Sequence, residues 1–185
     1  YYFYPRVDHE FLAAHSEGVI ATSGCMSAEV PRAIREGDLE KAQRMLDWYY
    51  EVFGPERFFL ELQDHNIPEL RQINRTLLDW RSRYNARYLA TNDAHYVRRE
   101  DARLQDILLA IQTGALLSDP NRMRMNDDSY YLRSPEEMRS LFHEVPDANG
   151  NTLLVAEQCN VDLSKTGYHL PMFDVPEEYG SAEAY

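Results

Sequence analysis

Residues 92–95, Asn-Asp-Ala-His, contain the pair of side chains best suited to chemistry in this sequence. They follow a short apolar run at residues 88–90 that is typical of a buried strand. Residues two apart in an extended chain point to the same side, so Asp93 and His95 are expected to project together. A converging carboxylate and imidazole suit a divalent metal, or a general base with its orienting partner. The alternative is an ordinary Asp–His pairing in a loop, because such tripeptides are common by chance.

Two more polar clusters follow predicted strands and strengthen the metal interpretation. Ser23-Gly24-Cys25 follows residues 19–22, and Gln63-Asp64-His65 follows residues 58–62. In parallel α/β folds, sites assemble where the strands end. Cys25, Asp93 and His95 would supply a thiolate, a carboxylate and an imidazole, which suits Zn²⁺ or a similar metal. Such a metal lowers the pKa of a bound water toward ~7 and neutralises a phosphoryl group, as phosphoester hydrolysis requires.

The remaining candidates are assigned weaker roles. Asp64 and His65 form a second Asp/His pair, which is expected to belong to a strand-end and capping network beside the ligands, with a direct role at the site as the alternative. Thiol catalysis, with Cys25 as nucleophile, His95 as base and Asp93 as orienter, is an alternative without a flanking signature. The second cysteine, Cys159, is expected to be a small buried residue. No catalytic residue beyond the metal ligands is assigned.

The elements that must position these residues alternate between strands and helices. The patterns predict strands at residues 19–22, 58–62 and 87–91, and helices at residues 8–16, 27–36, 38–53, 67–84 and 100–113. Asp38 and Asn66 are expected to cap the third and fourth helices. The fifth helix is expected to carry the apolar residues Leu104, Ile107, Leu108 and Ile111 and to end at Gly114. This rhythm predicts a parallel sheet, either a barrel or a doubly wound sheet.

The pattern changes after residue 114. A polar loop at residues 115–128 is followed by a short strand near 130–132. Ser134-Pro135-Glu136-Glu137 forms a capping box with proline at the first helical position, so a helix is expected at residues 135–143. A last helix near 147–159 contains Gly150, and the chain beyond residue 161 is loop-rich. Four aromatic residues at positions 1–4 favour burial, so the chain is expected to begin inside a fold as part of something longer.

The composition narrows the classes of function. A hydrophobic content of 44% is typical of a globular protein. The net charge of −12, from 31 acidic and 19 basic residues, argues against a broad phosphate-binding surface. Contacts with DNA would have to be local or mediated by metal. Two cysteines indicate no disulfide framework, and neither a signal pattern nor a membrane-spanning run is present, so we expect a cytoplasmic protein that does not contact a membrane.

An ordered set of motifs resembles a known family. The motifs include Ser23-Gly24-Cys25, residues 61–65 (Glu-Leu-Gln-Asp-His), residues 91–96 (Thr-Asn-Asp-Ala-His-Tyr), residues 111–114 (Ile-Gln-Thr-Gly), residues 119–122 (Asp-Pro-Asn-Arg) and residues 131–138 (Tyr-Leu-Arg-Ser-Pro-Glu-Glu-Met). They resemble the later part of the PHP (polymerase and histidinol phosphatase) domain of bacterial DNA polymerase III alpha subunits. Residues 1–162 would be the C-terminal part of this domain, and residues 163–185 a connector toward the polymerase palm.

The resemblance implies part of a distorted (β/α)₇ TIM-like barrel with a helical C-terminal extension and without its N-terminal strands. It also implies a cluster of divalent metals, Zn with Mn or Mg as alternatives, at a 3′–5′ proofreading exonuclease site. Cys25, Asp93 and His95 match three of the family's ligands, and the others, including an H-x-H motif, are expected outside this chain. By itself the chain is expected to bind metal weakly and to be inactive. Ala115 departs from the pattern, because the family often has lysine there.

The resemblance also names partners and alternatives. The partners would be DNA and replisome subunits such as the sliding clamp and the proofreading subunit. One alternative is a structural, partner-binding domain whose metal site is vestigial. The other is a small-molecule phosphoesterase related to histidinol phosphatase, although the palm-like residues 163–185 argue against it.

Overall fold

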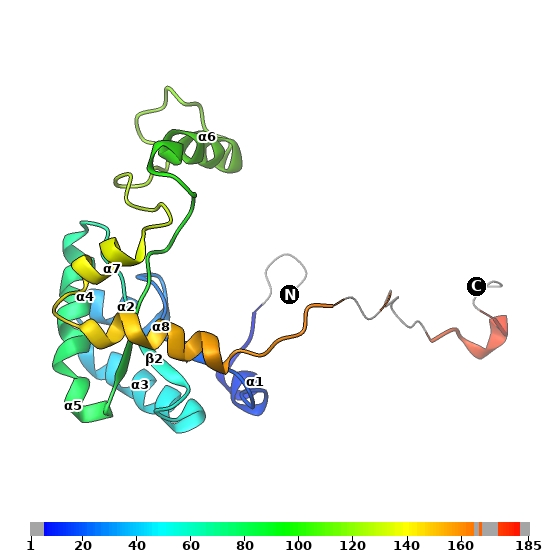
Figure 1. The fold of residues 1–185 in the computed structure, drawn as a ribbon. Coiled ribbons are helices and arrows are strands. Elements are labelled where there is room, and N and C mark those ends of the chain that lie inside the picture. The colour runs from blue at the N-terminus through cyan, green and yellow to red at the C-terminus, as the bar shows by residue number, and fades with distance from the viewer. Residues whose placement is uncertain (1–5, 165–166, 168–173, 182–185) are drawn as a thin grey trace.

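A three-stranded parallel sheet lies at the centre of the computed structural model, which describes residues 6–164, 167 and 174–181. The strands are β1 (Ala21–Thr22), β2 (Phe58–Leu62) and β3 (Arg87–Ala90), in the order β1-β2-β3. In register, Thr22 pairs with Phe59, and Leu62 pairs with Ala90. Helices connect each strand to the next, as parallel pairing requires. The chain is therefore a mixed α/β protein with a small parallel sheet (Figure 1).

Helices make up most of the regular structure. They are α1 (His9–Ala14), α2 (Glu29–Arg35), α3 (Leu39–Phe53), α4 (Pro68–Asp79), α5 (Arg81–Tyr84), α6 (Ala102–Thr113), α7 (Pro135–Leu141) and α8 (Pro146–Gln158), with 3₁₀ turns η1 (Arg99–Asp101) and η2 (Glu177–Tyr179). Asp38 caps α3 as predicted, and the capping box between Ser134 and Glu137 begins α7. Within the described part of the chain, no helix combines the length and apolar character needed to cross a membrane.

The two faces of the sheet have different surroundings. Phe58, Leu60 and Leu62 on β2 are buried in a core with residues of α2, α3, α4 and α8. The ring of Tyr49 on α3 stacks on Phe58 at 4.9 Å. Because side chains alternate along a strand, Glu61 points to the opposite face. The helices of the main core therefore cover one face, and the other face carries a charged residue.

The N-terminus of α4 differs from the prediction. Ile67 is the N-cap and Pro68 the first helical residue, whereas Asn66 has a φ of +54° and donates its backbone N–H to Asp64 Oδ1 at 3.1 Å. Proline lacks an N–H and has a φ suited to the first turn, and the residue before it is held extended. The proline therefore overrides the capping preference of the asparagine. The predicted helix also divides at Trp80 into α4 and α5.

Other predictions need smaller corrections. The strand predicted near 130–132 is a single bridge between Tyr96 and Tyr131. Gly150 lies inside α8 without interrupting it. Cys159 is exposed rather than buried, because it is the C-cap residue after the last turn of α8. The aromatic run at residues 1–4 lies outside the described residues, as do residues 165–166, 168–173 and 182–185 of the predicted connector.

The helix predicted at residues 100–113 is present as α6, but most of its apolar residues do not face a core. Leu104, Leu108 and Ile111 of α6 are exposed, and the buried residues of this helix are Leu109 and Ala110. Figure 1 shows the reason, because α6 and the loop after it stand away from the body that contains the sheet. The apolar stripe is present in α6 as the periodicity indicated, but no element of the described chain covers it.

Candidate functional site

Asp93 and His95 lie together just beyond β3. Their side chains face one another, with His95 Nε2 3.4 Å from Asp93 Oδ1, and both are about 40% exposed. The backbone N–H of His95 donates to the carbonyl of Tyr130 at 2.8 Å. The imidazole also packs edge-on against the Tyr130 ring, with the ring centroids 5.7 Å apart. The pair is thus open to solvent on one side and supported by Tyr130 on the other.

The backbone of Asp93 explains how the pair forms. Asp93 has a φ of +48°, in the left-handed region. The prediction assumed an extended chain, whereas the structure brings the two side chains together through a turn. Aspartate is tolerated there better than most residues, but such a conformation typically costs about 1–3 kcal/mol. Strain of this kind is found most often at functional sites.

Cys25 follows β1 after a turn that requires glycine. Gly24 has a φ of +72°, and a Cβ at this position would lie 2.8 Å from the Cβ of Ala28. Cys25 itself is exposed, and its carbonyl accepts from the Ala28 N–H at 2.9 Å. Across the described residues, no group of three or more His, Cys, Asp or Glu side chains could hold a metal. The structure therefore pairs Asp93 with His95 and leaves Cys25 outside that pair.

The chemistry of the pair suits part of a metal site. A carboxylate and an imidazole are ligands that zinc and similar metals accept, and neither side chain is committed to the core. Two ligands do not complete a catalytic site, which needs at least three from protein. The assignment of Cys25, Asp93 and His95 as a ligand set stays a prediction.

Glu61 links the ends of all three strands. Its carboxylate accepts from Thr22 Oγ1 at 2.7 Å, from Thr91 Oγ1 at 2.5 Å and from Gln63 Nε2 at 3.0 Å. Its backbone N–H donates to Ser23 Oγ at 2.8 Å. These bonds join β1, β2 and β3 on the face opposite the main core. They hold in register the strand ends from which Cys25, His65 and Asp93 emerge.

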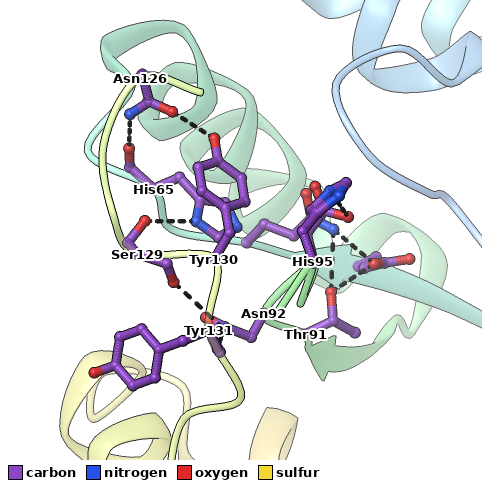
Figure 2. A network of polar contacts seen from close by, with 11 residues as sticks. His65, Thr91, Asn92, His95, Asn126, Ser129, Tyr130 and Tyr131 are labelled. Atoms are coloured by element: carbon purple, nitrogen blue, oxygen red, sulfur yellow. Dashed lines mark hydrogen bonds and ion pairs between the residues drawn. The ribbon is translucent and has the colours of Figure 1, made fainter. Parts of the chain in front are cut away.

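His65 anchors a second network, which supports Tyr130 (Figure 2). The His65 side chain is buried, and its ring stacks on Tyr130 with centroids 3.9 Å apart. His65 Nδ1 lies 2.9 Å from Ser129 Oγ, and Asn126 Nδ2 donates to the His65 carbonyl at 2.6 Å. The Tyr130 hydroxyl donates to Asn126 Oδ1. Residues 126–130 are thus fastened to the end of β2, and Tyr130 in turn contacts His95.

Burial and neighbouring charges shift the titration of this network. Burial lowers the pKa of His65, and the guanidinium of Arg133 lowers it further, against the opposing effect of Asp93. Burial also raises the pKa of Tyr130 to about 12. At neutral pH both rings are therefore uncharged.

We expect the free energy of unfolding to fall as the pH drops below about 6.5. The folded protein holds the pKa of His65 below its usual value, so the unfolded chain binds more protons in the interval between the two. This stability is present above pH 6.5 and is lost as the pH falls through the folded pKa. A single group such as His65 can contribute a slope of at most about 1.4 kcal/mol per pH unit.

Urea unfolding of the wild type and of His65→Gln across this pH range measures the contribution of His65. His143→Gln is the control, because His143 is exposed and its Nδ1 contacts only the Ser140 carbonyl. Equal slopes for the wild type and His65→Gln would contradict the prediction.

Several members of the site were not identified from the sequence. Glu61 could have been noticed, because a carboxylate inside the apolar run Phe-Phe-Leu-Glu-Leu is unusual in a buried strand. Asn126, Ser129 and Tyr130 gave no such signal. They lie about sixty residues from His65, and only the folded chain brings them there. Asp64 has a local role, since its Oδ1 accepts from the Asn66 N–H.

Comparison with known proteins shows what the chain resembles. Residues 1–65 match the family model described as PHP domain, a range that includes Cys25 but not Asp93 or His95. The DNA polymerase III subunit alpha of Thermus aquaticus is 42% identical over 190 residues, covering 100% of this chain and 15% of that protein. The same subunit is 38% identical in Treponema pallidum (100% and 16%) and 41% identical in Deinococcus radiodurans (99% and 14%). The chain therefore spans 14 to 16% of the length of these relatives.

Proposed function

We propose that the chain is part of a replicative DNA polymerase with a metal-dependent 3′–5′ exonuclease site. Over its whole length the chain is homologous to one segment of DNA polymerase III alpha subunits, and its first 65 residues match the PHP domain. The observation that carries the exonuclease proposal is the Asp93–His95 pair, half exposed at the carboxyl edge of a parallel sheet. In parallel α/β folds, that edge is where active sites are built.

The fold supports a barrel rather than a doubly wound sheet. A doubly wound sheet has helices on both faces, whereas here α2, α3, α4 and α8 pack on the face of Leu60. The opposite face carries the Glu61 network, as the interior of a barrel with a polar site would. We therefore assign residues 1–162 to the C-terminal part of a (β/α)₇ TIM-like PHP domain. Residues 163–185 are assigned to a connector that leads to the palm.

Cys25, Asp93 and His95 would hold a divalent metal, Zn, Mn or Mg, together with ligands from an H-x-H motif elsewhere in the subunit. When bound, such a metal neutralises the phosphoryl group and activates water for hydrolysis. Tyr130 would fix the orientation of His95 through ring packing and through its carbonyl. His65 would hold Tyr130, and Glu61 would keep the strand ends in register.

The partners follow from the same assignment. DNA would reach the site through the rest of the subunit, since this chain carries a net charge of −12. Replisome subunits such as the sliding clamp and the proofreading subunit would bind the polymerase, which acts in the cytoplasm. The whole chain matches one segment of polymerase subunits, and this match gives no support to a free-standing enzyme related to histidinol phosphatase.

A second candidate is a structural PHP domain with a vestigial site. It is favoured by one observation: the described residues pair Asp93 with His95 but contain no group of three metal-binding side chains. In this case the domain would support the polymerase and contact other subunits without hydrolysing DNA.

Metal removal distinguishes the two candidates. We expect the complete alpha subunit to shorten a primer with a mismatched 3′ end in the absence of nucleotides, to lose this activity after dialysis against a chelator, and to regain it when Zn²⁺ or Mn²⁺ is restored. Elemental analysis before and after dialysis measures the metal directly. A metal-free subunit that never digests the primer would overturn the exonuclease proposal and favour the structural one.

A further inference from the structure

Helix α6 presents an uncovered apolar face. Leu104, Leu108 and Ile111 are spaced by four and three residues, which places them on one side of the helix, and they are 59%, 57% and 71% exposed. The loop after α6 adds Leu116, Leu117 and Met123, which are 75%, 52% and 62% exposed. We call residues 97–128 the α6 arm, and Figure 1 shows it standing away from the body of the protein.

The α6 arm is held in shape by its own contacts. The guanidinium of Arg122, whose side chain is 3% exposed, binds both carboxylate oxygens of Asp106 on α6. Arg99 binds Asp128 through two bonds of 2.8 Å and ties the two ends of the arm together. An isolated 12-residue helix is marginal in water, so the Arg122–Asp106 pair and the buried residues Leu109 and Ala110 help to stabilise α6. They leave its apolar face free.

An exposed aliphatic face of this kind usually marks an interface. Single exposed leucines are common on soluble proteins, but several that adjoin one another on one element are not. The charge of the α6 arm also favours an interface with protein. It contains five arginines and six acidic residues, so it is close to neutral in a chain of net charge −12. A nearly neutral, aliphatic surface suits packing against protein rather than against DNA.

We propose that the exposed face of α6 packs against another segment of the same polypeptide, outside these 185 residues. This inference rests on the proposed function, which makes the chain one segment of a longer subunit. The relatives support this occupant, because the chain spans only 14 to 16% of their length. A covalently joined segment is present at high effective concentration, so an apolar contact of modest size is sufficient.

The test compares the 185-residue chain with the complete subunit. In the complete subunit we expect backbone amides of residues 104–111 to exchange with deuterium at least about tenfold more slowly than in the chain alone. The double variant Leu108→Glu/Ile111→Glu is expected to abolish this difference. In the chain alone it should change the Tm by less than about 2 °C, because both side chains already face solvent.

Leu39→Glu is the matched control, since Leu39 is an exposed leucine of α3 in the body, and it should leave the exchange of α6 unchanged. Three results would overturn the inference: equal exchange in both proteins, protection only when a separate subunit is added, or light scattering that shows the chain alone to be a dimer which the double variant dissociates. A complete subunit that protects α6 but holds no metal and digests no primer would refute the exonuclease proposal and leave this inference intact.

Discussion

Replacing Leu60 with alanine is expected to lower the free energy of unfolding by about 2–5 kcal/mol. Leu60 is fully buried in β2, the central strand, and faces the core formed with α2, α3 and α4. Alanine would remove three carbon atoms from a position at which neighbouring strands and helices limit the collapse of the cavity. The loss therefore contains both a transfer contribution and a cavity contribution.

Urea unfolding followed by circular dichroism measures this effect. Leu104→Ala is the control, because it makes the same chemical change in a side chain that is 59% exposed on α6. We expect that variant to differ from the wild type by no more than about 0.5 kcal/mol. Similar losses for the two variants would mean that α6 is covered in the isolated chain, and would contradict the structure.

Features set by neighbouring residues could be predicted from the sequence. The bounds of β2 follow from an apolar run that is interrupted only by Glu61, and the start of α3 follows from the capping preference of Asp38. The capping box of α7 is specified by four consecutive residues. In each case the interaction that stabilises the element joins residues close together in the chain.

Features that depend on distant contacts could not be predicted. Periodicity identified the apolar stripe of α6, but it does not say whether another element covers that stripe, and none in the described chain does. Cys159 follows the last turn of α8, and its exposure depends on how that helix packs. The Asn66 prediction failed for a local reason, because Pro68 set the start of α4 one residue later.

The candidate site likewise contains one part that neighbouring residues determine and another that depends on distant contacts. Asp93 and His95 are two residues apart, so their proximity could be expected even though the backbone turns there instead of remaining extended. The supports of the pair come from elsewhere in the chain. Tyr130 contacts His95, and His65 stacks on Tyr130 across a separation of 65 residues. No sequence pattern connects these rings, and their roles emerge only when residues 126–130 lie against the end of β2.

In the complete subunit, Asp93→Asn is expected to reduce metal-dependent exonuclease activity by more than about 100-fold. Loss of residues that merely support a metal ligand costs about 10–100-fold, so removal of a ligand should exceed that range. Stability should change by less than about 1 kcal/mol. Asparagine tolerates the left-handed backbone of Asp93, and the half-exposed ion pair with His95 contributes little. Primer digestion, metal content and urea unfolding of the same preparation measure all three quantities.

Glycine at position 93 separates the strain of the backbone from the chemistry of the side chain. Because glycine adopts a positive φ without steric cost, Asp93→Gly is expected to raise the free energy of unfolding by up to about 1 kcal/mol while also losing activity. Asn85→Gly is the matched control, since Asn85 has a φ of +46° at the end of α5 and no role in the proposed site. It should gain similar stability and keep full activity. If Asp93→Gly were as active as the wild type, the carboxylate would not be a metal ligand.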